Sequence, residues 1–255
     1  MTLIEHSSGN YRFLSGIAPY SCGVIAMPDF EIVHVKLRSP IPINETVFHL
    51  IEGHLSNLDR PVQALCAMEL RIPSALSFEE FKEFNDSYQK ILKDRGLLLG
   101  DVNPIARTNI SPAEFDLNQA SVYAFSYTVP IVDNFKGSSF IVAGAGDLAD
   151  QTDLSTKAIV RPNEKSSDAR QEKVKVVMKV MEDRLYGLKA HWSDVSSVSI
   201  YSKMPLQGLL VENILKPMEQ AALQGVNWYY STPPIKGLDY EMDMRGVRKE
   251  YITEL

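Results

Sequence analysis

The chain has 255 residues, of which 45% are hydrophobic and 23% are charged, proportions typical of one large or two small globular domains. Its formal net charge of −6 argues against a nucleic-acid surface, because phosphate binding needs clustered lysine and arginine. The two cysteines, Cys22 and Cys66, are too few for a disulfide framework and lack metal-ligand spacing. No segment approaches the ~20 apolar residues of a membrane span, and no secretory signal begins the chain, so we expect a cytoplasmic protein.

The first part of the chain predicts strands and helices in alternation. Its clearest helix begins at Ser77, which forms a capping box with Glu80, continues with apolar residues at helical spacing, and ends near Gly96. The other predicted elements are strands at 20–26 and 30–37 joined by a turn at 27–29, a helix at 44–56, a strand at 61–70 and a strand at 119–129.

A polar break at 133–139 separates a second part with the same order of elements. Its predicted elements are a strand at 140–143, a loop at 147–165, a helix from 167 to about 186, a strand at 195–201, a helix at 206–224, and strands at 226–231 and 238–244. Pro217 is expected to kink the helix that contains it. The cationic cluster from Arg170 to Lys179 is interleaved with Glu172 and predicts a solvated helix face. The sequence therefore predicts an α+β fold of two domains, 1–133 and 138–255.

Six short segments occur along the chain in a recognisable order. They read APYSCGV at 18–24, FKEFNDSYQKIL at 81–92, the ART around Arg107, SSFIVAGAGDL at 138–148, DVSSVSIYS at 194–202 and LDYEMDM at 238–244. The ordered set resembles the reactive intermediate deaminase (RidA/YjgF, endoribonuclease L-PSP-like) family, and in its tandem length it is similar to 2-aminomuconate-type deaminases. The resemblance implies two chorismate mutase-like domains, each a mixed sheet with helices on one face.

The resemblance also implies a cofactor-independent hydrolase that releases ammonia from enamine or imine acids. Arg107 matches the family arginine, and a guanidinium binds a carboxylate through two parallel hydrogen bonds. Glu241 matches the residue that activates water, and the hydroxyl of Tyr20 can bind substrate or water. The alternatives are a surface ion pair for Arg107, a solvated strand face for Glu241 with Asp239 and Asp243, and a packed core tyrosine.

Four further residues are candidates for substrate binding. Ser21 follows Tyr20 in the first motif, and Asn85 matches a family asparagine, although an exposed helix position is the alternative. Trp228 and Tyr230 are two residues apart and so are expected on one strand face. There they would either contact a planar ligand or pack in the core. The five histidines have no ligand spacing, so no metal is expected. GAGDLA at 144–149 spells a dinucleotide fingerprint, but no helix is predicted directly after it, which argues against that function.

Neither half holds a complete set of family residues. Tyr123 stands where the first half needs its glutamate, and the second half has no matching arginine. Family sites lie between neighbouring domains of a threefold ring, so Arg107 of one half is expected to face Glu241 of the other. We therefore expect a homotrimer, or a hexamer if trimers stack, with a small carboxylate metabolite as ligand and no nucleic acid or membrane partner. Degenerate sites in a non-catalytic metabolite-binding module are the alternative, and RNA cleavage fits the acidic charge poorly.

Overall fold

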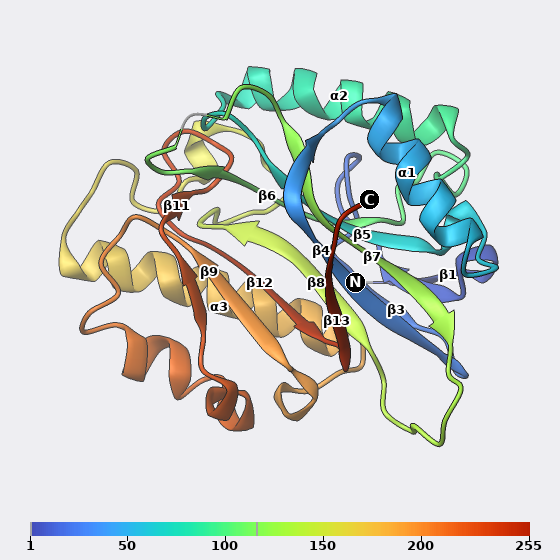
Figure 1. Ribbon diagram of the computed structural model, residues 1–255. Coiled ribbons are helices and arrows are strands. Elements are labelled where there is room, and N and C mark those ends of the chain that lie inside the picture. The colour runs from blue at the N-terminus through green and yellow to red at the C-terminus, as the bar shows by residue number, and fades with distance from the viewer. Residues whose placement is uncertain (1, 116) are drawn as a thin grey trace.

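Two mixed β-sheets face each other, and helices cover their outer faces (Figure 1). The computed structural model describes residues 2–115 and 117–255. The first sheet has the spatial order β11 (Ser231–Thr232), β6 (Ala106–Pro112), β5 (Leu65–Arg71), β7 (Ser121–Pro130), β4 (Phe30–Pro42) and β13 (Lys249–Thr253). The second has the order β1 (Leu3–His6), β2 (Tyr11–Leu14), β3 (Gly23–Ala26), β8 (Phe140–Gly146), β12 (Glu241–Gly246), β9 (Ser197–Tyr201) and β10 (Asn227–Tyr229). The mixed α+β architecture expected from the sequence is therefore present.

The helices divide between the two sheets. α1 (Glu45–Ser56) and α2 (Phe78–Asp94) pack on the first sheet, and α3 (Ser167–Gly187) packs on the second. One apolar core lies beneath each helical layer, and a smaller apolar cluster lies between the sheets. No helix within the described ranges is both long and apolar enough to cross a membrane.

The capping box predicted for α2 is confirmed. The Ser77 hydroxyl accepts a hydrogen bond from the Glu80 backbone N–H at 3.1 Å, and the Glu80 carboxylate accepts one from the Ser77 N–H at 2.6 Å. The buried face of this helix contains Asn85 among its apolar residues, so the predicted alternative of an exposed asparagine is wrong. A buried amide needs a hydrogen-bond partner, so Asn85 must find one in the sheet beneath the helix.

The helix predicted at 206–224 is replaced by irregular structure. A π-helical turn covers Leu210–Leu215, and a 3₁₀ helix covers Glu219–Gln224. Pro217 lies between them and has no backbone N–H to continue the helix, while Glu219 takes a left-handed φ of 51°. Strands β1, β2 and β13 have no counterpart among the predicted elements.

The two sheets exchange strands near both ends of the chain. The predicted turn at 27–29 is present, with Asp29 at a φ of 67°, but it leads from β3 in one sheet to β4 in the other. β13 lies beside β4 in the first sheet, although β12 just before it belongs to the second. The strand pair expected at 20–37 is therefore split, because β3 pairs with β2 and β8 instead. The boundary between 133 and 138 stays a prediction, and it separates most but not all strands by sheet.

Candidate active site

A small cavity lies where β6 of the first sheet runs beside β8 of the second. Its volume is about 30 Å³. Its lining comes from five parts of the chain: Tyr20; Phe81 of α2; Arg107 and Asn109 of β6; Gly144, Gly146, Leu148, Gln151 and Leu154; and Pro234, Ile235, Leu238 and Glu241. The structure therefore brings together the three residues predicted as catalytic, Arg107, Glu241 and Tyr20. They come from both predicted halves of one chain.

Arg107 is buried beneath α2, with 3% of its surface exposed. Its Nη2 donates a hydrogen bond of 2.7 Å to Oδ1 of Asn85, and its Nη1 has no partner among the described residues. The rings of Tyr20 and Tyr88 each lie 4.9 Å from its Cζ. Burial lowers the pKa of this guanidinium, and the nearby Tyr88, Tyr20 and Glu241 oppose that effect. The alternative of a surface ion pair is wrong, since no carboxylate within the described residues lies at ion-pair distance.

Glu241 begins β12 and is 4% exposed. Its side chain occupies the space over Gly144, where a Cβ atom would lie 2.4 Å from Oε1 of the glutamate. Burial raises the pKa of Glu241 well above its usual value, Asp243 adds to the increase, and Arg184 and Arg107 oppose it. Burial therefore favours the protonated form of this carboxyl group, which can donate a proton. A solvated strand face is wrong for this residue, because the face of β12 that carries Glu241 and Asp243 points between the sheets.

Tyr20 contributes its ring to the cavity as well as its hydroxyl. The ring packs on the guanidinium of Arg107, and burial raises the pKa of the phenol. Ser21 beside it is buried, and its hydroxyl donates a hydrogen bond of 2.9 Å to the Pro104 carbonyl. Ser21 therefore fixes the loop that carries Tyr20 and does not line the cavity.

Trp228 and Tyr230 are not brought to this cavity. They are 48% and 58% exposed on and beside the edge strand β10, and the Trp228 indole donates to the Ser202 carbonyl at 3.0 Å. Core packing, the alternative reading, is wrong for both residues, because β10 ends the second sheet and only an irregular helical segment precedes it.

Asn109 is a cavity residue that the sequence reasoning missed. It lies two positions after Arg107 on β6, so the two side chains share a strand face. Its Oδ1 and Nδ2 are both buried without a hydrogen-bond partner among the described residues. An unsatisfied buried amide costs about 1–3 kcal/mol, which a ligand that pairs with it would offset. The period-2 alternation from Arg107 was the signal that could have identified it.

The GAGDLA segment lies against Glu241. It lacks the α-helix that would bind a dinucleotide phosphate, since β8 is followed by turns. Gly144 leaves space for the glutamate, and Asp147 connects the segment to the start of β12. Oδ1 of Asp147 accepts hydrogen bonds from the backbone N–H groups of Asp239 and Tyr240, at 3.0 and 3.1 Å. The same carboxylate pairs with Lys173 of α3 at 2.8 Å, and both side chains are fully buried.

Lys173 corrects one expectation for the cationic cluster at 170–179. Most of that helix face is solvated, but Lys173 points inward and pairs with Asp147, which follows β8 and accepts hydrogen bonds from the backbone just before β12. The cluster was defined by its positive charges, and the acidic partners of Lys173, Asp147 and Asp239, are distant from it in sequence.

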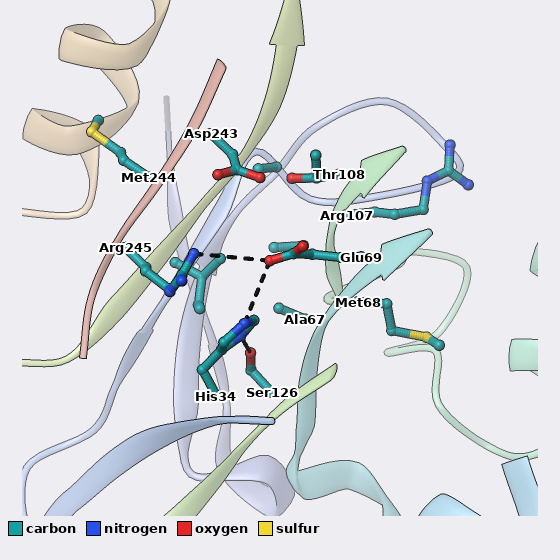
Figure 2. Close-up of a pocket in the computed structure, with 13 residues that line it drawn as sticks. His34, Ala67, Met68, Glu69, Arg107, Thr108, Ser126, Asp243, Met244 and Arg245 are labelled. Atoms are coloured by element: carbon teal, nitrogen blue, oxygen red, sulfur yellow. Dashed lines mark hydrogen bonds and ion pairs between the residues drawn. The ribbon is translucent and has the colours of Figure 1, made fainter. Parts of the chain in front are cut away.

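A second polar cluster lies between the sheets, and Thr108 is among the residues that line it (Figure 2). There Glu69 faces His34 at 3.6 Å and Arg245 at 3.9 Å, and Asp243 accepts a hydrogen bond from Tyr201. Burial and the nearby Glu69 raise the pKa of Asp243 to about 6. The space among these residues is about 10 Å³, too small for more than a water molecule. In Figure 2 the guanidinium of Arg107 points away from Glu69, His34 and Arg245.

Comparison with known proteins gives one close relative. The chain is 35% identical over 249 residues to 2-amino-5-chloromuconate deaminase from Comamonas testosteroni, and the match covers 98% of each chain. Solved structures are less similar. A chorismatase gives a TM-score of 0.49 at 11% identity over 88% of this chain and 77% of its own, and a candidate endoribonuclease from Thermotoga maritima gives 0.30 at 13% over 47% and 84%.

The family comparison covers nearly all of the chain. The family described as 2-aminomuconate deaminase CnbZ matches residues 3–251, which include every residue of the cavity. The predicted similarity to 2-aminomuconate-type deaminases is confirmed, while membership of the wider RidA family stays a prediction. On the strength of this match and of the 35% identical relative, the chain belongs to the 2-aminomuconate deaminase family.

Proposed function

We propose that the protein is a hydrolytic deaminase of a conjugated 2-amino dicarboxylic acid of the muconate type. The observation that carries this proposal is the pairing of two buried groups in one cavity. Arg107 has a free Nη1 for a carboxylate, and the Glu241 carboxyl group has a raised pKa for proton transfer. Family membership supports the same substrate class.

The first step is protonation of the enamine. Glu241 gives its proton to a carbon of the conjugated chain, and the nitrogen lone pair forms a C=N double bond. Arg107 holds the adjacent carboxylate through charge-assisted hydrogen bonds, which fixes the carbon that bears the nitrogen. A neutral acid suits this step, because a carboxylate with an ordinary pKa carries no proton at neutral pH.

The second step adds water. The Glu241 carboxylate now takes a proton from water as the water oxygen bonds to the imine carbon, and the C=N electron pair returns to nitrogen. Glu241 then protonates the amino group, the C–N bond breaks, and the hydroxyl proton returns to Glu241 as the carbonyl forms. One water is consumed and one ammonia is released, with no oxidation, so the sequence of steps needs no cofactor. Asn109 is placed to hydrogen-bond the new oxygen.

Substrate enters through a larger outer pocket of about 250 Å³ that shares Tyr20 and Gln151 with the inner cavity. The inner cavity has about the volume of a single water molecule. Binding therefore requires the Tyr20 or Gln151 side chain to move aside. Tyr20, which packs on Arg107, would then close over the bound carboxylate.

Two expectations about assembly belong to the same proposal. The halves are tandem RidA-like units that have exchanged terminal strands, and chains associate as homotrimers. Tyr251 and Ile252 of the edge strand β13 are 53% and 70% exposed, which supports association along that edge. Light scattering tests this, and a monodisperse monomer would contradict it.

The decisive experiment measures ammonia released from freshly generated 2-aminomuconate. We expect turnover by the wild-type chain, a loss of about 10²–10⁴ in kcat for Glu241→Gln, and unchanged kcat for the matched variant Glu83→Gln, whose glutamate is exposed on α2. Arg107→Ala should weaken carboxylate binding at least about tenfold. Saturable binding by the wild type without any ammonia would favour the non-catalytic binding module.

A further inference from the structure

The outer pocket contains a second buried arginine. Arg184 of α3 is 2% exposed and lines the pocket with Tyr20, Cys22, Gln151 and Val180. Its Nη1 donates hydrogen bonds of 2.9 and 3.1 Å to the carbonyl oxygens of Ala143 and Gly144. These two bonds fix one edge of the guanidinium on β8 and leave its remaining donors available to the pocket.

The charge of Arg184 is not balanced by an acidic partner. Among the described residues no carboxylate lies at ion-pair distance from it, and the same holds for Arg107. Asp183 also lines the outer pocket, but its carboxylate pairs with Lys179 at 2.6 Å. Buried arginines are normally paired, because an isolated charge in a low-dielectric site is costly. Two unpaired guanidinium groups thus lie within one connected site.

Both guanidinium groups act electrostatically on the same acid. Arg184 and Arg107 each oppose the increase in the pKa of Glu241, and each also lowers the pKa of Tyr20. Arg107 lines the inner cavity, Arg184 lines the outer pocket, and Tyr20 lines both. A ligand that reaches both would pass Tyr20 and present an anionic group at each end.

We propose that Arg184 binds the distal carboxylate of the substrate and so selects dicarboxylates over monocarboxylates. Arg107 binds the carboxylate beside the reacting carbon, and the conjugated chain lies between them against Tyr20. The two cations match the two negative charges of a muconate-type dianion. This inference rests on the proposed function and assigns a specificity-determining residue to it.

A matched pair of unreactive ligands tests the inference without catalysis. trans,trans-Muconate and sorbate share one six-carbon diene and differ only in having a carboxylate or a methyl group at the far end. Calorimetry should give wild-type protein at least a tenfold preference for muconate. Arg184→Met should remove that preference and leave sorbate binding within about twofold, Arg184→Lys should retain part of it, and Lys175→Met, an exposed lysine on α3, should change nothing.

The outcomes separate the inference from the function that it deepens. Arg184→Met could weaken both ligands equally because Arg184 also holds two carbonyl groups of β8. An equal loss, an unchanged preference in this variant, or no preference in the wild type would each overturn the inference, even if ammonia release from 2-aminomuconate is observed. An Arg184-dependent preference in a wild-type chain that releases no ammonia would instead retain the inference and overturn the deaminase.

Discussion

Replacing Gly144 with alanine should impair turnover while leaving the fold nearly intact. The added Cβ would lie 2.4 Å from Oε1 of Glu241, whereas ordinary contacts begin near 3.4 Å. The added methyl group cannot shift away from Glu241, because its carbon would already lie 3.1 Å from Cγ2 and 3.3 Å from Cα of Thr108. The carboxyl group must therefore move by about 1 Å, and a displacement of that size costs about 10²-fold in rate. Since the displaced atom ends a flexible side chain, the stability cost should stay within about 1–3 kcal/mol.

The assay compares kcat for ammonia release with the free energy of unfolding in urea. Gly53→Ala is the control, because a Cβ there meets no atom within 4 Å, and α1 should gain about 0.5–1 kcal/mol with unchanged kcat. Glu241→Asp should partly restore the Gly144→Ala enzyme by shortening the displaced side chain. Unchanged kcat in Gly144→Ala would refute the placement of Glu241 at the reaction centre.

Four other outcomes are expected. The folded state raises the pKa of Glu241, so the free energy of unfolding should fall as pH rises from about 4.5, and Glu241→Gln should flatten that slope in urea titrations. Lys173→Met leaves Asp147 buried without a counter-ion and should lower the free energy of unfolding in urea by about 3–5 kcal/mol. Adding Asp147→Asn should make that loss smaller, and a loss below about 1 kcal/mol in the single variant would contradict the pairing. Mixed Arg107→Ala and Glu241→Gln chains should show no restored ammonia release, because both residues line one cavity within a chain, and activity above either parent would show sites between chains. Trp228→Ala should change kcat/KM less than about twofold, since the indole lies outside both pockets; a tenfold loss would restore its predicted role.

Local features of the sequence predicted much of the fold. The capping box at Ser77 and the apolar stripe after it identified α2, since both signals act within a few residues of each other. The ordered motifs led to Arg107, Glu241 and Tyr20, which share a cavity. The features that the sequence did not predict depend on contacts between residues that are distant in the chain. Alternation along 238–244 could not show that a second sheet covers the face of Glu241, and the turn at 27–29 gave no sign that it leads from one sheet to another.

The missed site residues have the same explanation. Arg184 lies at the helical spacing of the apolar stripe, seven residues after Val177 and three after Met181, but only the packing of α3 on β8 and the pairing of β8 with β12 place its guanidinium near Glu241. Asn109 can be placed on the same strand face as Arg107 only once the extent of strand β6 is known. The absence of a nearby counter-ion is a property of the packed chain, so no local pattern could report it.

The exchange of terminal strands affects how the chain must be made. One edge of β4 stays unpaired until β13, its parallel neighbour, has been synthesised. Pairings so remote in sequence give high contact order, which slows folding and prolongs exposure to aggregation. Neither half can complete its sheet before the other is present. The nascent protein should therefore depend on chaperones until β13 has been synthesised, and expressing the halves as separate polypeptides should yield insoluble material.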